Sequence, residues 1–522
     1  MHSVLRQKSR IILAVLLPGL ITTLTACGTI GPKYVKPAVT VNQEWTQNDA
    51  RVATASPTDT AWWHAFNDPV LDKLIDLAYH QNLPLQIAGL RIAEARAQLA
   101  VAAGSKWPQV QQLFADATAV GLSNDSANVR NFDRNFVSYS AGFDALWELD
   151  FWGKYKNIER AAGANYFGTI ADYDTSLVTL TAEVARTYAL IRTFQVLIAQ
   201  AGQNVTVQEE GFRIADSRFR NGATSELDVT QAETLLEDTR STIPQLEISL
   251  RQAENALATL IGQPTGTVAQ LLGESNGIPA PPPQVAVSIP AELLRRRPDI
   301  RSAEFTAIEN SARIGIATAD LYPSFSLLGT IGVGGASASG ANGASLFYSV
   351  GPRITLPFLD YGRTRNRIRA EDARFQQAVV AYQQTVLVAA QEVEDGMVGY
   401  LKSLDAAGYA GKAAAAAKRS ADIAFVQYRE GAVDFQRVLD AMRVLLEQQN
   451  LFAQTRSATA TNLISLYKAL GGGWELRVDK PFIPDPMRQE MENRTRWGDL
   501  LSTPPPATEL EKVEGHEEPH HE

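Results

Sequence analysis

The chain has 522 residues, of which 45% are hydrophobic and 20% are charged, and its formal net charge is −9. This composition is ordinary for a folded protein, and the length allows several domains or one large elongated one. The acidic balance argues against nucleic acid as a partner, because phosphate binding requires clustered lysine and arginine.

The first 26 residues have the features of a secretory signal peptide. Three basic residues within 6–10 precede a short apolar stretch at 11–21, as signal peptides require. The segment ends in LTACG at 24–28, which resembles a bacterial lipobox. In such a motif the cysteine is lipidated and becomes the first residue. We therefore expect a covalent lipid on Cys27 and no other cofactor.

Cys27 is the only cysteine, so an intrachain disulfide is impossible. Beyond residue 21 no apolar run reaches the ~20 residues of a membrane-spanning helix. Any further membrane contact is therefore expected to be made by strands. Isolated histidines and a His-containing C-terminal end give no metal-binding pattern that we would assign as a site.

The two halves of the chain repeat one another. At an offset of 209 residues Tyr173 matches Tyr382 and Gly222 matches Gly431, and an earlier block matches at an offset of 215. So long a period excludes a solenoid and indicates a duplication. The expected organisation is a lipid-anchored extended segment and part of an equatorial belt at 27–67, repeat 1 at 68–262, an equatorial linker at 263–289, repeat 2 at 290–471, and an equatorial segment with a disordered tail at 472–522.

Each repeat is expected to begin with a helix and continue with two strands. The strands are placed at about 108–121 and 135–149 in repeat 1, and at about 323–334 and 345–358 in repeat 2. Polar loops rich in glycine, serine and asparagine separate them. Strands of ~10 residues with alternating faces are what a transmembrane barrel requires. Two soluble hairpins are the alternative.

A long helical pattern follows the strands in each repeat and returns after a short turn. The turns are expected at 220–226 and 429–435, with Gly222 ending the first helix in a left-handed conformation. Ser225 or Thr224 is expected to cap the next helix, with Asp228 in its first turn. Pro244 is expected to kink that helix. Sixty helical residues extend ~90 Å, far beyond an ordinary globular helix.

Four strands per chain cannot close a barrel, because the smallest common bacterial barrels have eight. The chain must therefore oligomerise if these strands lie in a membrane. A dimer would supply eight strands and a side-chain-filled interior, whereas a trimer would supply twelve and an open one.

Several motifs together resemble the TolC-like outer-membrane efflux proteins, specifically the lipoprotein branch that serves RND-type tripartite pumps. They are the lipobox Cys27, WW at 62–63 with FNDP at 66–69, LLRRRPDIRSAE at 293–304, LYPSF at 321–325, GPRITLPFLDYGRTR at 351–365 and YREGAVDFQRVLDA at 428–441. The resemblance covers nearly all of the mature chain.

The resemblance implies an α+β membrane protein assembled as a homotrimer. Four transmembrane strands per protomer would form a 12-stranded β-barrel in the outer membrane, continued by a 12-helix periplasmic α-barrel. It implies a passive exit duct for small molecules from an inner-membrane efflux transporter, joined through a periplasmic adaptor. It implies no catalytic residues, so the protein is not expected to be an enzyme.

The resemblance places both turns at the periplasmic end of the tube. It implies that the tips meet the adaptor through Arg220, Gly222, Ala223, Arg429, Gly431 and Ala432. It also implies a pore constriction formed by the Asp440 carboxylates, with Asp228 and Tyr428 in closed-state hydrogen bonds. Arg437 and Val433 depart from members that carry Asp and Arg there, so the closed-state network is expected to differ and a double carboxylate ring is excluded.

Two other classes of function remain. A lipid-anchored periplasmic coiled-coil scaffold would use the hairpins as a spacer and would have no channel. A surface-anchored enzyme would need a pocket with converging ionisable groups, and the sequence offers no such constellation.

Overall fold

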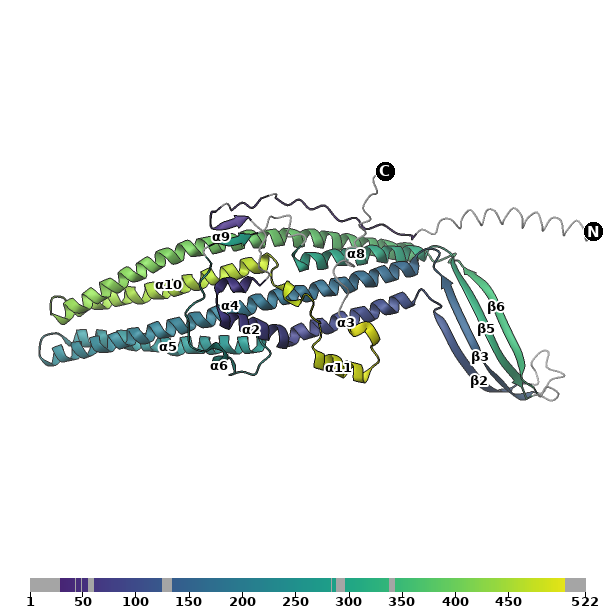
Figure 1. Ribbon diagram of the computed structural model, residues 1–522, viewed down its shortest axis with the longest axis horizontal. Coiled ribbons are helices and arrows are strands. Elements are labelled where there is room, and N and C mark those ends of the chain that lie inside the picture. The colour runs from purple at the N-terminus through teal and green to yellow at the C-terminus, as the bar shows by residue number, and fades with distance from the viewer. Residues whose placement is uncertain are drawn as a thin grey trace, which may run out of the picture.

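The computed structural model describes residues 29–502, apart from residues 43, 48, 55–60, 124–133, 283, 288–295 and 338–342. The molecule is elongated, with two long helical hairpins at one end and a four-stranded sheet at the other (Figure 1). The signal peptide, Cys27 and the C-terminal tail expected from the sequence lie outside the described residues.

The sheet joins the two repeats. Strands β2 (Val110–Gly121), β3 (Asn135–Leu149), β5 (Ser324–Ala336) and β6 (Ser345–Thr355) are antiparallel in the order β2-β3-β5-β6. The expected strand positions are therefore confirmed. The central pair, β3 and β5, comes from different repeats, so neither repeat forms the sheet alone.

The sheet has one apolar and one polar face. Side chains alternate between faces along a strand, and directly paired residues share a face. One cross-strand row on the apolar face is Leu113, Phe143, Ile331 and Tyr348, and all four are exposed. The neighbouring row on the opposite face is Gln112, Asp144, Thr330 and Ser349. Thr330 Oγ1 donates to Asp144 Oδ1 over 2.7 Å. An exposed apolar face is unusual for a protein in water and indicates that the face contacts a membrane or another protein.

The helical hairpins repeat almost without change. In repeat 1, α4 (Lys154–Arg220) returns through α5 (Glu226–Leu260). In repeat 2, α9 (Arg363–Arg429) returns through α10 (Phe435–Ala469). Both limits of α9 and α10 lie 209 residues after those of α4 and α5. The shorter helices α3 (Leu83–Gly104) and α8 (Pro298–Ala319) lead into the sheet with the offset of 215.

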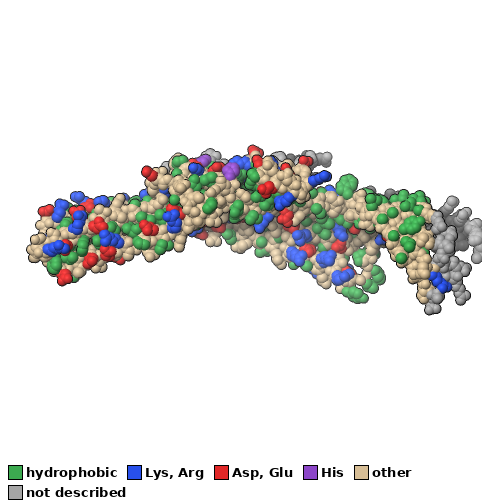
Figure 2. Space-filling view, turned by 90° about the horizontal axis from the view of Figure 1, so that it is seen from below, with side chains coloured by type: hydrophobic (Ala, Val, Ile, Leu, Met, Phe, Trp, Pro, Cys, Tyr) green, Lys and Arg blue, Asp and Glu red, His purple; other side chains and the backbone are tan. Residues whose placement is uncertain are grey.

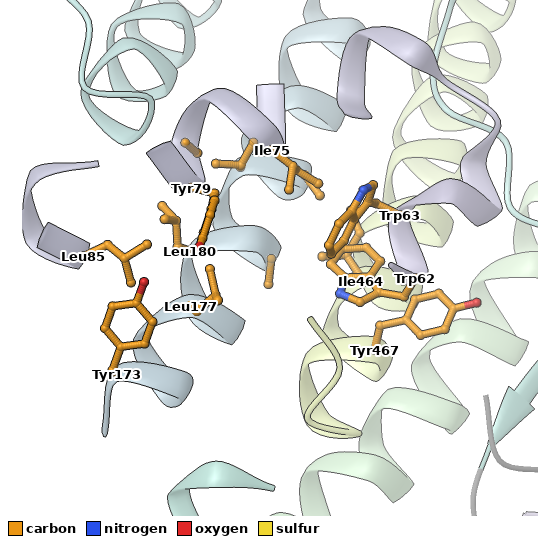
Figure 3. Close-up of a cluster of buried hydrophobic side chains, with 14 of the residues drawn as sticks. Trp62, Trp63, Ile75, Tyr79, Leu85, Tyr173, Leu177, Leu180, Ile464 and Tyr467 are labelled. Atoms are coloured by element: carbon orange, nitrogen blue, oxygen red, sulfur yellow. The ribbon is translucent and has the colours of Figure 1, made fainter. Parts of the chain in front are cut away.

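A belt of short elements surrounds the middle of the hairpins. It contains α2 (Pro69–Gln81), α6 (Val268–Leu272), α11 (Asp485–Arg494), three 3-10 turns at Trp62–Phe66, Trp474–Arg477 and Gly498–Leu501, and the parallel pair β1 (Val52–Thr54) and β4 (Val285–Val287). The largest buried cluster lies here. Trp62 stacks on Tyr467 with ring centroids 5.3 Å apart, while Tyr79 of α2 and Leu177 of α4 lie on the other side of the cluster (Figure 3).

The FNDP motif starts α2, a helix that the sequence analysis did not separate from its surroundings. Asp68 caps it by accepting hydrogen bonds from Val70 N at 3.0 Å and Leu71 N at 3.4 Å. The second Asp68 oxygen accepts from Tyr188 Oη at 2.6 Å, and Arg192 Nε donates to the same Tyr188 hydroxyl at 3.0 Å. The motif therefore fastens the belt to the buried face of α4.

An extended N-terminal strap, residues 29–54, runs along the outside of α8 and α9 (Figure 1). Glu304 on α8 accepts from Lys36 Nζ at 2.6 Å, and Asp405 on α9 accepts from Arg51 Nη1 at 2.7 Å. At the sheet end Ile30 N donates to Trp152 O at 3.0 Å. The strap thus links the sheet end of the molecule to its belt.

One local expectation is wrong. Ser225 occupies the N-cap position of α5, but neither its side chain nor that of Thr224 caps the helix. Thr224 Oγ1 donates instead to the Asp228 carboxylate, which competes with the backbone for the hydroxyl. Asp228 lies in the first turn, as expected, and Pro244 lies inside α5. Among the described helices, none is both long and apolar enough to cross a membrane.

Candidate functional site: the helical tips

The two tips, residues 220–226 and 429–435, have the same backbone geometry. Gly222 has φ +71° and Gly431 has φ +78°, values that glycine adopts without steric cost. The two hydrogen bonds after the first helix run from Gly222 N to Phe219 O at 2.9 Å and from Ala223 N to Arg218 O at 2.8 Å. Equivalent bonds from Gly431 N and Ala432 N close the second tip. Both are Schellman turns, which satisfy the last carbonyls of a helix.

The outer surface of both tips is charged and locally paired. Arg220 contacts Asp216 at 3.0 Å, and Arg429 contacts the adjacent Glu430 at 3.5 Å. Both arginines are exposed, as are Gly222, Ala223, Gly431 and Ala432. Charged side chains of both signs gather at this end of the molecule in Figure 2. Exposed pairs of this kind contribute little stability, so these side chains are available to a partner.

Beneath this surface Tyr428 is the centre of a small apolar cluster. Its ring is buried and meets Phe435 edge to face with centroids 5.3 Å apart. Ala215 and Ala232 from repeat 1 belong to the same cluster, so the two tips pack on one another. The Tyr428 hydroxyl has no hydrogen-bond partner among the described residues.

The ionisable side chains that influence Tyr428 belong to repeat 1. Burial and the negative charge of Asp228 raise the pKa of the Tyr428 phenol, an effect that the positive charge of Arg218 opposes. Asp228 lies close enough for this influence but takes its hydrogen bond from Thr224. Within the described residues the two side chains do not bond to each other, and the closed-state hydrogen bonds that the family resemblance implies for each of them stay a prediction.

Arg218 lies two residues before tip 1 and was not among the residues predicted from the sequence. Its guanidinium lies over the Tyr428 ring, with Cζ 4.8 Å from the centroid, and Nη1 donates to the Tyr428 backbone carbonyl. At the offset of 209 the residue in repeat 2 is Gln427. Because the contact is asymmetric, comparing the two repeats does not reveal Arg218 as a functional residue.

Asp440 lies two turns into α10 and is exposed. Gln436 Nε2 donates to Asp440 Oδ1 at 2.9 Å, and Gln231 Nε2 from α5 donates to Gln436 Oε1 at 3.2 Å. This chain of amides connects the carboxylate to repeat 1. Arg437 is exposed on the turn before it, and its backbone N donates to Asp434 Oδ1 at 3.4 Å. The carboxylate is thus oriented yet open to solvent.

The described residues contain no group of three or more histidine, cysteine or acidic side chains placed to hold a metal ion. The site is therefore best described as a set of turns, a buried aromatic ring and oriented charges. Such a set can bind a protein surface or affect the passage of ions.

Comparison with known proteins agrees with this architecture. Residues 74–263 and 289–472 match the family described as outer membrane efflux protein. The chain is 32% identical to the outer membrane protein OprJ of Pseudomonas aeruginosa PAO1 over 87% of this chain and 94% of that protein. It is 29% identical to the probable outer membrane lipoprotein SilC of Salmonella typhimurium over 86% and 96% of the two chains.

A solved structure, that of the outer-membrane channel OprN, superimposes with a TM-score of 0.79 at 31% identity, covering 86% of this chain and 100% of the other. The family match covers all four strands of the sheet and both hairpins. The chain therefore belongs to the outer membrane efflux protein family, and it is an outer-membrane efflux channel that extends into the periplasm.

Proposed function

We propose that three copies of this chain form a passive exit duct that takes small molecules from a periplasmic adaptor and an inner-membrane efflux transporter. The observation that carries the proposal is the two-faced sheet with two unpaired edges. Within the described residues β2 and β6 each pair on one side only. Three such sheets joined edge to edge make twelve strands, enough for an open interior.

The side chains near the edges support this assembly. Antiparallel pairing of β6 with β2 of the next copy places the end of β6 beside the start of that β2. Phe358 and Tyr361, which follow β6, are 88% and 94% exposed, and Trp107, which precedes β2, is 68% exposed. These large apolar groups would cover one another in the assembly. A closed sheet also removes the exposed edges that otherwise favour aggregation.

The faces of the sheet then have distinct roles. The apolar row through Ile331 would contact lipid, and the polar row through Asp144 would line the water-filled interior. A lipid on Cys27 would hold the N-terminal strap at the same membrane. Membrane attachment would thus rest on two elements, the lipid and the barrel.

The tips would contact the adaptor and close the duct. Arg220, Gly222, Ala223, Arg429, Gly431 and Ala432 form the exposed turns, six of which would meet the adaptor in a trimer. Asp440 would face the axis, where three carboxylates attract cations and repel anions. Asp228, Tyr428 and Arg437 lie at the tip ends of their helices and would set how far the tips separate. This function is passive and assigns no catalytic role to any residue.

The test is ion conduction by the purified, lipidated protein in planar bilayers. We expect a small cation-selective conductance, and Asp440→Asn is expected to lower the ratio of cation to anion permeability. Asp434→Asn is the matched control, because Asp434 caps α10 through Arg437 N and is exposed at the turn itself. Absence of conductance, together with release of a Cys27→Ser protein from the membrane by alkali, would favour the lipid-anchored scaffold instead.

A further inference from the structure

Arg218 makes two different contacts with one residue of the other repeat. Its guanidinium stacks over the Tyr428 ring at 4.8 Å, and it donates to the Tyr428 carbonyl oxygen. Tyr428 is the last residue but one of α9, so that carbonyl lies at the negative end of the helix dipole. The cation therefore interacts with a π face and with a helix C-terminus at once.

The turn of tip 2 leaves space for the Arg218 guanidinium beside Gly431. A methyl group placed on Gly431 would lie 3.6 Å from Arg218 Nη2, so the turn of tip 2 forms one wall of the contact. Arg218 is only partly exposed, whereas the side chain of Arg220 two residues later is 75% exposed. Partial desolvation strengthens a cation–π contact.

The duplication supplies an internal comparison. At the positions equivalent to Arg218 and Tyr428, the other repeat carries Gln427 and Phe219. Gln427 is exposed, and Phe219 is also exposed, in contrast to the buried Tyr428. The reciprocal contact cannot form with these side chains, because an amide carries no charge. This link between the tips is therefore directional, because repeat 1 supplies the cation and repeat 2 supplies the ring and the carbonyl.

We propose that Arg218 is the latch of the two tips, a positioning residue that holds Tyr428 and the end of α9 against α4. This inference rests on the proposed function, and it adds a residue and a chemical mode of closure to it. The latch acts through the ring and the backbone carbonyl of Tyr428. It does not need the phenol hydroxyl.

Two measurements test the latch. Hydrogen exchange of the amides at 425–432, in the purified assembly, reports whether tip 2 is held. Single-channel conductance reports whether the tips restrict the duct. Arg218→Ala is expected to raise exchange at 425–432 about tenfold and to enlarge the conductance, because it removes a charged hydrogen bond and a cation–π contact together. Arg213→Ala is the matched control on the same helix, because Arg213 is exposed and donates to Glu209 O of α4 itself, and it is expected to change neither.

Variants at Tyr428 distinguish the ring from the hydroxyl. Tyr428→Phe keeps the ring and the carbonyl and should behave like the wild type, whereas Tyr428→Leu should resemble Arg218→Ala. The double variant of Arg218→Ala and Tyr428→Leu should add little to either single change. Arg218→Lys keeps the charge and one donor and should restore part of the protection. Opening by Tyr428→Phe as large as by Tyr428→Leu would overturn the mode of closure proposed here.

The two proposals fail separately. If tip exchange rises in Arg218→Ala but no variant conducts ions, the latch stands and the duct does not. If the wild type conducts and Arg218→Ala changes neither exchange nor conductance, the duct stands and the latch is wrong. A lower melting temperature of Arg218→Ala, with unchanged exchange at 425–432, would show that Arg218 serves general stability and would also overturn the latch.

Discussion

Arg477 and Asp174 form a two-point ion pair that joins the C-terminal part of the belt to α4. Arg477 Nη2 lies 2.8 Å from Asp174 Oδ2, and Nε contacts the other carboxylate oxygen. Asp174 is fully buried, and the guanidinium also lies over the Phe482 ring, 5.1 Å from its centroid. Residues more than 300 positions apart are thereby held together in the middle of the molecule.

Removing one member of this pair should destabilise the belt strongly. Arg477→Met leaves a buried carboxylate without its main partner, which costs about 3–5 kcal/mol. Thermal unfolding of the purified protein would measure the loss. Arg488→Met is the control, since Arg488 pairs with Asp485 at 2.8 Å on the surface and such pairs contribute about 0–1 kcal/mol. Equal destabilisation by both changes would show that the buried pair has no special role.

The two faces of β6 should respond differently to a charge. Val350 is 73% exposed on the apolar face, and Ser349 lies on the polar face. Val350→Arg should cost about 2–4 kcal/mol if that face contacts lipid, whereas Ser349→Arg should cost little. The fraction of protein that resists urea extraction from outer-membrane preparations measures insertion. Comparable loss of insertion from both variants would contradict the assignment of the faces.

The tip glycines should matter through their backbone angle alone. Gly222 has φ +71° and no atom within 4 Å of the position where a Cβ would lie, so Gly222→Ala introduces only backbone strain, about 1–2 kcal/mol. Gly202, inside α4, also has open space, and Gly202→Ala should stabilise the helix by up to ~1 kcal/mol. Hydrogen exchange at 215–226 should therefore rise for Gly222→Ala and not for Gly202→Ala. Equal exchange in both variants would show that the turn tolerates alanine.

Alkaline pH should weaken the contact between the belt and α4. Burial and the hydrogen bond to Asp68 raise the pKa of Tyr188 to about 12, above its ordinary value of 10. The group thus stabilises the fold fully below pH ~10, and this contribution is lost as the pH rises toward 12. The stability difference between the wild type and Tyr188→Phe should shrink across that interval. A difference that stays constant from pH 9 to 12 would mean that Tyr188 does not titrate in it.

Features spread over many residues could be predicted from the sequence. The four strands and both hairpins have local periodicity, and the duplication shows each twice, so β3 and α9 lie where the sequence placed them. The contacts of the belt and of the N-terminal strap could not be predicted in the same way. The strap contacts of Lys36 with Glu304 and of Arg51 with Asp405 span more than 260 residues and have no local pattern.

The site was predictable only in part. Both glycine turns follow from local rules, because few residues accept a positive φ. The side-chain contacts at the tips do not, since hydroxyls and guanidinium groups choose among several nearby acceptors. Thr224 donates to Asp228 where a helix cap was expected. Arg218 contacts Tyr428 of the other repeat, although the equivalent residue in repeat 2 is Gln427.

Covalent linkage between the free edges of the sheet tests the trimeric barrel most directly. The chain has a single cysteine, Cys27, so pairs can be introduced with little background. One cysteine at Ala115 in β2 would be combined with one at Leu346, Tyr348 or Val350 in β6, and oxidised membranes would be analysed on denaturing gels. A trimeric barrel predicts a ladder that ends at three chains for at least one pair. Only monomers from every pair, or a ladder that ends at two or continues past three, would contradict the trimeric barrel.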